Sequence, residues 1–373
     1  PDVPPLIHQA NFNLSTTKTR KDLAATLSER RPDVLWPVLL EQICNYVRDA
    51  HRRGAPEEEV REVIPSSIVN YRLAPMCPEG QISLIFGEGG SLKTYIAQVA
   101  AVCVQTGWQL SPLVPRQGNV LYLDYETSKE EFDNRVALLR DGCGFPHPKG
   151  LIYRRCSRPL VDDGAEIQRI VTQRDITFGV LDSVGMACVG EDASASFDAV
   201  GIRLLRALRQ LHITWLLIDH VAKAAERGKG RTPFGTVYKF NEARSVWEAI
   251  AAEGTAEGAA NIALYHRKAN NSRRLPPLGF RFTFSPEAVS VNPEAPIAIP
   301  ELREHLEAVY KIQNAFDEHP QAMTIDALVR LTSLKVDTVR KTLDRYKGHR
   351  FSSDGGKPAL WRWLSTETPE TFR

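Results

Sequence analysis

The chain has 373 residues, more than one compact core usually holds, so two or three domains are expected. Hydrophobic residues make up 43% and charged residues 25%, and the net charge of +2 excludes a protein that is strongly basic over its whole surface. The six cysteines form no C-x-x-C pair, and no apolar run approaches the roughly 20 residues that span a bilayer. Together with a start that lacks a signal-peptide pattern, these features predict a cytoplasmic protein without a membrane partner.

The first region, residues 1–74, is predicted to be a helical arm. It begins as a loose segment and continues into "DVLWPVLLEQICNYVRDAHRRG", whose apolar residues recur at helical spacing before a glycine. "APEEEVREVI" then predicts a second short helix with acidic residues in its first turn.

The second region, residues 75–292, alternates short apolar strands with helical stretches. Continuous apolar strands separated by helices predict an α/β fold, with a mostly parallel sheet covered by helices on both faces. The last two strands lie close together in sequence and predict an antiparallel edge. The predicted strands are "QISLIF", "VLYLDY", "FGVLD", "TWLLID", "NIALYH", "FRFTF" and "AVSVN".

A proline-rich linker at residues 293–300 separates this region from a C-terminal domain, residues 301–373. There, "TIDALVRLTSL" and "KVDTVRKTLDRY" predict two helices with a short turn, and "HRFSSDGGKPALWRWL" predicts a hairpin around Asp354-Gly355-Gly356. Helix, turn, helix and hairpin together resemble a winged-helix domain.

Within the second region, "GEGGSLKT" nearly matches the phosphate-binding pattern G-x-x-x-x-G-K-[ST], but Leu92 replaces the glycine before the lysine. The segment follows a predicted strand and precedes a predicted helix, as that motif requires. We expect Lys93 to reach the β- and γ-phosphates of ATP and Thr94 to ligate Mg²⁺, and we expect Leu92 to fit if its φ is negative. The alternative is a glycine turn before a buried helix. The predicted nucleotide-binding residues are Gly87, Glu88, Gly89, Gly90, Ser91, Leu92, Lys93 and Thr94.

Acidic residues end the following strands, at the sheet edge where open α/β sheets bind ligands. "VLYLDYET" ends in Asp124 and Glu126, and "FGVLDS" ends in Asp182, the Walker B form of a Mg²⁺-holding strand, acting mostly through water. "WLLIDH" ends in Asp219 and His220. For Asp124 we favour a solvated carboxylate without a role in the site.

These motifs, in this order, resemble the RecA-like ATPase core over residues 75–285, especially the RepA-like and DnaB-like hexameric helicase branch. "YLDYET" is similar to the segment with the catalytic glutamate, "VLDSVGMA" to the Walker B segment, and "LLIDHVAK" to the sensor strand. The resemblance implies that Glu126 polarises the attacking water, Asp182 holds the water shell of Mg²⁺ and His220 senses the γ-phosphate. It also implies that "GTVYKFNEARSVWEA", residues 235–249, contains the helix that follows a mobile loop.

Phosphoryl transfer also needs positive charge beyond the γ-phosphate, often from a neighbouring subunit. "YHRKANN" occupies the place of such groups in this family, so Lys268 or Arg267 is a candidate, although the family's K-x-R pattern is absent. Arg244 is a second candidate, with a salt bridge on a helix surface as its alternative.

Two basic segments predict contact with nucleic acid, and with DNA in particular. Lys223, Arg227, Lys229 and Arg231 lie in a glycine-containing loop after His220, in the position that lines the channel of RecA-like rings. Residues 330–362 hold nine Lys or Arg residues against Asp337, Asp344 and Asp354. There, Arg340, Lys341 and Arg345 are the predicted DNA-binding residues, with protein docking as the alternative role of the domain.

The sequence thus predicts an ATP-driven motor, a homo-oligomeric, hexameric ring that moves nucleic acid, as in a mobile-element helicase. A switch that assembles on DNA with ATP and regulates a partner without unwinding is the alternative. A small-molecule kinase is disfavoured, because the chain offers a basic loop and a winged helix in place of an acceptor lid.

Overall fold

The computed structural model describes residues 8, 12–53, 59–60, 69–188, 197–221, 241–253, 258–270 and 273–364. Its internal contacts divide the chain into two compact units, Pro1–Ser66 and Ser67–Arg373, and each unit is considered by itself. Among the described residues, no helix combines the length and the hydrophobicity that crossing a bilayer requires.

The described residues of the first unit form two helices, α1 (Thr17–Arg30) and α2 (Trp36–Arg53). The expectation of a loose segment before α2 is therefore wrong for α1. The buried face of α1 is narrow, because Ala24 and Leu27 alone pack fully on Leu40 of α2. The sequence of α1 therefore shows only a weak apolar pattern at helical spacing. The helix predicted in "APEEEVREVI" lies outside the described residues except for residues 59–60, which are not helical.

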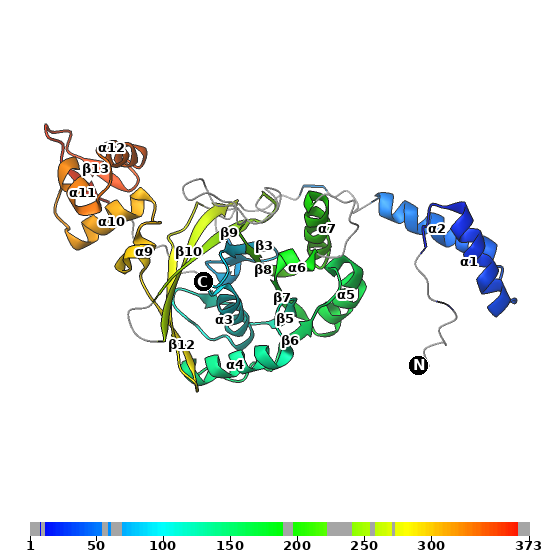
Figure 1. Cartoon of the computed structure of the whole chain (residues 1–373). Helices are drawn as coiled ribbons and strands as arrows, with labels where there is room; N and C mark the ends of the chain where they lie inside the picture. The colour runs from blue at the N-terminus through cyan, green and yellow to red at the C-terminus, as the bar shows by residue number, and fades with distance from the viewer. Residues whose placement is uncertain are drawn as a thin grey trace. The chain divides into compact units, whose positions relative to one another are not determined.

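The second unit is built on a nine-stranded sheet in the order β12-β11-β10-β9-β3-β8-β7-β5-β6 (Figure 1). The pairs from β9 to β6 are parallel, and those from β9 to β12 are antiparallel. The predicted mostly parallel sheet with an antiparallel edge is confirmed. The strands are β3 (Ile82–Gly87), β5 (Asn119–Asp124), β6 (Leu151–Arg155), β7 (Ile176–Asp182), β8 (Thr214–His220), β9 (Ser245–Glu253), β10 (Ala259–Ala269), β11 (Leu278–Phe284) and β12 (Val289–Pro293).

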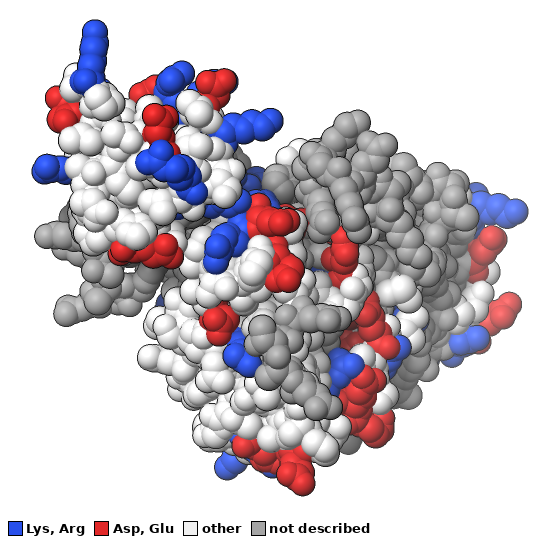
Figure 2. Space-filling model, turned by 60° about the vertical axis from the view of Figure 1, so that its left-hand side comes forward, with Lys and Arg blue, Asp and Glu red and all other residues white. Residues whose placement is uncertain are grey.

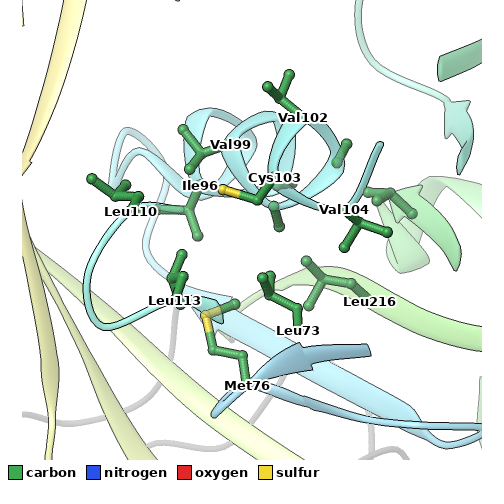
Figure 3. Close-up of a cluster of buried hydrophobic side chains, with 14 of the residues drawn as sticks. Leu73, Met76, Ile96, Val99, Val102, Cys103, Val104, Leu110, Leu113 and Leu216 are labelled. Atoms are coloured by element: carbon green, nitrogen blue, oxygen red, sulfur yellow. The ribbon is translucent and has the colours of Figure 1, made fainter. Parts of the chain in front are cut away.

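Helices cover both faces of this sheet, as predicted. On one face lie α3 (Lys93–Thr106) and α4 (Lys129–Cys143), and on the other lie α5 (Gly164–Gln173), α6 (Val184–Ala187) and α7 (Phe197–Gln210), after a 3-10 turn, η1 (Leu160–Asp163). Successive residues of each strand point into opposite hydrophobic cores, so the residues on both faces of the strand must be apolar. For example, Tyr122 faces α3 and α4, whereas Leu123 faces the helix layer on the other side of the sheet. Figure 3 shows the underside of α3, with Ile96, Cys103 and Val104 directed toward Leu73, Met76 and Leu216.

Two parts of this unit differ from the expected pattern. In the segment 235–249, residues 241–242 are helical, as expected, but residues 245–249 belong to strand β9, because Val246 and Trp247 enter the two opposite cores; residues 235–240 lie outside the described ranges. A small antiparallel sheet forms from β1 (Tyr71–Ala74), β2 (Cys77–Pro78) and β4 (Val114–Pro115), with β1 supplied by the end of the expected arm.

The expected linker is partly packed. A 3-10 turn, η2 (Pro296–Ala298), leads to α9 (Pro300–Arg303), and Ile297, Ile299 and Leu302 lie against Ala263 and Tyr265 of β10. The residues that follow form α10 (Ala308–Glu318), α11 (Ile325–Thr332), α12 (Val336–Arg345) and the hairpin β13 (Phe351–Ser353) with β14 (Trp361–Trp363). The predicted helix, turn, helix and hairpin are thus present around a separate small core.

Candidate functional site

The predicted phosphate-binding segment lies between β3 and α3, in the strand, loop and helix order that the motif requires. Gly87 has no room for a side chain, because a Cβ there would lie 2.4 Å from the backbone oxygen of Ala249 on β9. Gly90 has a φ of +75°, which glycine adopts readily. The loop therefore needs both glycines, and it opens onto the N-terminus of α3, where backbone N–H groups favour anions.

Leu92, which stands where the motif has glycine, adopts a left-handed conformation with φ 60° and ψ 17°. The condition under which leucine was expected to fit, a negative φ, is not met. A left-handed conformation costs a residue with a Cβ roughly 1–2 kcal/mol. The side chain is half-buried against the core beneath α3, so its packing offsets part of that strain.

The Lys93 side chain is buried and folds back onto its own loop. Its Nζ donates hydrogen bonds to the backbone oxygens of Gly87 (3.0 Å) and Glu88 (2.6 Å) and to Ser91 Oγ (3.1 Å). Burial lowers the pKa of Lys93, while the carboxylates of Asp182 and Glu126 raise it. The ammonium group of Lys93 now donates its hydrogen bonds to backbone carbonyl oxygens of the loop. When a nucleotide binds, the ammonium group can donate them to phosphate oxygens.

Asp182, at the end of β7, is buried beside Thr94. Its Oδ2 accepts a hydrogen bond from the Tyr122 hydroxyl at 3.0 Å, whereas Oδ1 is buried without a hydrogen-bond partner in the part of the chain that the structure describes. Burial raises the pKa of Asp182 to about 6, and the charge of Glu126 raises it too, whereas the hydroxyls of Thr94 and Tyr122 lower it. Tyr122 is a site residue that the sequence analysis missed.

This arrangement fits Mg²⁺. An orphaned, buried carboxylate oxygen next to a threonine hydroxyl supplies the hard oxygen ligands that Mg²⁺ prefers, and phosphates and water usually complete its shell. Among the described residues, no group of three or more His, Cys, Asp or Glu side chains could hold a metal ion.

Glu126 lies just beyond the end of β5 and meets side chains from the two neighbouring strands. Ser183 Oγ donates to Glu126 Oε1 at 2.5 Å, and His220 Nε2 lies 3.3 Å from the same oxygen. The hydrogen bond with His220 lowers the pKa of Glu126 most, ahead of that from Ser183, against an increase due to burial. The carboxylate is therefore held in its charged form, as a base requires. Ser183 was not predicted, although it directly follows Asp182.

Asp124 is a structural carboxylate, contrary to the expectation that it is solvated. It is 2% exposed, and its Oδ1 accepts hydrogen bonds from the backbone N–H of Glu126 (2.8 Å) and of Thr127 (2.9 Å). Its Oδ2 accepts one from the Thr127 hydroxyl. Asp124 thus fixes the turn that carries Glu126.

Strand register brings the predicted groups to one edge of the sheet. His220 is level with Gly87 across the β3–β8 pair, and Asp182 is level with Asp124 across the β5–β7 pair. Because β3, β8, β7 and β5 are consecutive neighbours, Lys93, Thr94, Asp182, Glu126 and His220 converge at their carboxyl ends.

Lys268 does not join this cluster. Lys268 is opposite Val246 on β9, and Val246 is opposite Leu84 on β3. Leu84 lies three residues before the phosphate-binding loop. The Nζ of Lys268 donates to the backbone oxygens of Asn241 (2.5 Å) and Ala243 (2.8 Å).

Arg267 and Arg244, the other two candidates for the positive charge beyond the γ-phosphate, differ in whether their guanidinium groups are paired with a carboxylate. Arg267 is bound to the buried carboxylate of Glu248, with Nε 2.7 Å from Oε2. Arg244 follows the turn that Lys268 holds and is not on a helix surface; its guanidinium is exposed and lines a hollow of about 250 Å³ together with Arg209, His212 and Glu242. Arg267 is thus neutralised, whereas Arg244 presents its charge outward.

Of the predicted nucleic-acid residues, Lys223, Arg227, Lys229 and Arg231 lie outside the described residues. Arg340, Lys341 and Arg345 are all exposed on α12. Figure 2 shows Lys and Arg side chains that stand apart, with Asp and Glu among them, over the described surface visible on that face. Positive charge is therefore local there and does not form one broad field.

Comparisons with known proteins give one family model and similar solved structures. Residues 52–226 match the family model described as an AAA domain. Among solved structures, the chain is similar to a KaiC-like protein of the hyperthermophilic archaeon Pyrococcus horikoshii OT3, with 18% identity, a TM-score of 0.44, and 63% of this chain and 100% of that chain covered. No curated protein matches the chain at a significant level. The second unit is thus an α/β domain with the strand, loop and helix order of a phosphate-binding motif, and its part up to residue 226 lies within the match to the AAA domain model.

Proposed function

We propose that this protein is an ATP-driven nucleic-acid motor, a helicase or translocase of the RepA-like or DnaB-like kind. In this proposal, identical subunits form a ring, most simply a hexamer, and hydrolyse ATP where they meet. The observation that carries the proposal is the convergence of Lys93, Asp182, Glu126 and His220 at the carboxyl edge of four neighbouring strands.

Each of these residues has a role that its chemistry supports. Lys93 and the loop N–H groups hold the β- and γ-phosphates of ATP. Thr94 and Asp182 are the residues that would hold Mg²⁺, which when bound offsets phosphate charge. Glu126 accepts a proton from a water molecule whose oxygen attacks the γ-phosphorus, while the bond to the bridging oxygen of ADP breaks. His220, in contact with Glu126, senses whether the γ-phosphate is present.

We assign the added positive charge to a neighbouring subunit. Lys93 is enclosed in its own loop, so a cation on the far side of the γ-phosphate must come from elsewhere. A head-to-tail ring joins the nucleotide edge of one subunit to a different surface of the next. Arg244 is better suited to that role than Lys268, because Lys268 is occupied in holding the turn from which Arg244 projects.

Mixing two inactive variants tests this arrangement. Arg244→Ala should lower kcat by roughly 10³-fold or more without weakening ATP binding, and Lys93→Ala should abolish tight ATP binding. In a 1:1 mixture of the two, about a quarter of the interfaces join an intact loop to an intact Arg244, so hydrolysis should return. If Arg244→Ala alone hydrolyses ATP like the wild type, the cation lies elsewhere, with Lys268 next.

Two basic surfaces support nucleic acid as the partner. We propose that the loop with Lys223, Arg227, Lys229 and Arg231, directly after the sensor strand, contacts a single strand in an ATP-dependent manner. We interpret residues 301–373 as a winged-helix domain that binds duplex DNA or a protein through α12. Alanine at all four loop positions should abolish DNA-stimulated hydrolysis and leave basal hydrolysis nearly intact, whereas deletion of 308–373, which leaves α9 and Leu306 packed on β10, should weaken DNA binding only.

The second candidate function is an ATP-dependent switch that assembles on DNA without unwinding it. The strained Leu92 in the phosphate-binding loop favours this candidate, since distortion there can slow turnover. Measurement of ATPase stimulation and of strand displacement on a tailed duplex distinguishes the two. A motor shows both, whereas a switch shows nucleotide-dependent DNA binding without displacement.

A further inference from the structure

Helix α2 carries an apolar stripe on the side that faces away from α1. Six large hydrophobic side chains in thirteen residues are between 37% and 78% exposed within the first unit: Leu35, directly before the helix, and Val38, Leu39, Ile43, Tyr46 and Val47 of α2. Their spacing of three and four residues puts most of them on one face of the helix. The opposite face holds Leu40 and Cys44, which are buried.

The contact with α1 is too small to account for a stable helical pair. Its buried hydrophobic cluster consists of Ala24, Leu27 and Leu40, with Leu23 and Trp36 at the margin. Helices of 14 and 18 residues are marginal in water without tertiary packing, and a two-helix unit of this size rarely supplies enough core. The exposed stripe is the surface through which such a unit gains the packing that it lacks.

We propose that the stripe pairs with the same stripe of a second copy of this chain, antiparallel about a two-fold axis, so that two α1–α2 hairpins form a four-helix bundle. Four-helix bundles solve this packing problem with helices of similar length. The six side chains expose on the order of 500 Å² per copy if a fully exposed large side chain presents roughly 150–200 Å². A symmetric pair would bury about 1,000 Å², the size at which specific interfaces begin.

Two polar features of α2 favour a second copy in antiparallel orientation. Gln42 is exposed near the middle of the stripe, flanked one turn away by Val38 and Tyr46. An amide both donates and accepts, so Gln42 can hydrogen-bond its own symmetry mate on the two-fold axis. The end of the helix carries Arg48, Arg52 and Arg53 with only Asp49 to oppose them. Parallel pairing would bring the two arginine clusters together, whereas antiparallel pairing separates them.

Sedimentation of the full chain without nucleotide tests the interface. We expect Leu39→Glu with Ile43→Glu to raise the dissociation constant of the smallest oligomer at least 100-fold, because two buried charges would face each other across the axis. Ala25→Glu, a charge on an exposed position of α1, is the matched control and should sediment like the wild type. A wild-type chain that is monomeric at 100 µM would overturn the proposal.

A cross-link gives a test that does not depend on disrupting the fold. Under mild oxidation, Gln42→Cys should form covalent dimers in high yield, whereas Ala25→Cys and the wild type should not. Hydrogen exchange of α2 in the full chain should slow as the protein concentration is raised through the dissociation constant. Failure of Gln42→Cys to cross-link, or protection of α2 that is equal at all concentrations, would mean that the stripe is covered within one chain and would overturn the proposal.

Discussion

Oε1 of Glu126 lies 3.3 Å from Nε2 of His220, although 94 residues separate them along the chain. The contact crosses β7, whose next residue, Ser183, donates a hydrogen bond to the same oxygen at 2.5 Å. Two strand ends therefore hold one oxygen of Glu126 and leave its orientation little freedom. If Glu126 is the base of the proposed hydrolysis, it is aligned before its substrate arrives, which is the condition for efficient proton abstraction.

Ser183→Ala should therefore impair the chemical step more than binding. The change removes one hydroxyl from a buried position and leaves Glu126 with His220 as its partner. We expect kcat for ATP hydrolysis to fall about tenfold with KM nearly unchanged, in line with modest loss of positioning. Ser183→Thr keeps the hydroxyl and should restore most of the rate. An equal loss of ATP affinity in both variants would assign Ser183 a merely structural role.

The left-handed φ of Leu92 predicts an unusual order of stability between two substitutions. Both Leu92→Ala and Leu92→Gly lose the half-buried side chain, but only glycine adopts this conformation without strain. We expect Leu92→Gly to be more stable than Leu92→Ala by about 1 kcal/mol in urea unfolding, the reverse of the usual order within a helix.

The same pair of variants tests whether strain affects turnover. If Leu92→Gly raises kcat severalfold while Leu92→Ala does not, relief of the backbone strain speeds hydrolysis, which favours the switch. Equal rates in the two variants would show that the conformation is tolerated without consequence for the reaction. An Ala variant as stable as the Gly variant would contradict the left-handed φ.

His266 predicts acid sensitivity of the fold. Its ring stacks on Trp247 at 4.1 Å, and Nδ1 accepts a hydrogen bond from the backbone N–H of Leu275 at 3.0 Å. Burial lowers the pKa of His266 to about 4. Between pH 6.5 and pH 4, His266 binds a proton in the unfolded chain but not in the folded chain. The free energy of unfolding is therefore at its full value above pH 6.5 and decreases as the pH falls. The loss between pH 7 and pH 5 should be about 2 kcal/mol.

Urea unfolding of the wild type and of His266→Gln at pH 5 and pH 7 checks this. The variant should be less stable at pH 7, because it loses the stacked ring, but its stability should change less between the two pH values. A pH dependence equal to that of the wild type would show that His266 titrates normally in the folded protein.

Sequence patterns predicted those parts of the fold in which a short stretch of residues determines both the element and its place. Lys93, Glu126, Asp182 and His220 each follow or end an apolar strand, which predicted that they meet at one edge of the sheet, because carboxyl ends of parallel strands share one edge. The C-terminal helices and hairpin were predicted for a similar reason, since each is bounded by turn residues.

The remaining features depend on tertiary placement that no local pattern contains. Asp124 looks like a solvated strand end in sequence, and only the turn that it caps reveals its structural role. Tyr122 and Ser183 matter because β5 and β7 are neighbours, an order that the sequence does not state. The packed segment at Ile297 depends on contact with β10, and the φ of Leu92 depends on how α3 docks beneath the loop.

The last prediction concerns α12, where Arg340, Lys341 and Arg345 are exposed. Asp337 lies 3.7 Å from Arg340, a surface pair too open to neutralise it. If these side chains contact phosphates, replacing all three with alanine should weaken duplex binding. The plot of log K against log salt should also lose about 2.7 from its slope, which is three contacts at about 0.9 each.

The matched control removes three exposed basic side chains from the ATPase part of the chain, Lys149, Arg174 and Arg206, and changes the net charge equally. It should leave the salt slope within about one unit of the wild type, because charge far from the contact releases few counterions. Fluorescence anisotropy of a labelled duplex at several salt concentrations measures both. If the control lowers the slope as much as the α12 variant does, binding follows overall charge and α12 is not the contact. If neither variant changes it, the domain docks protein and not DNA.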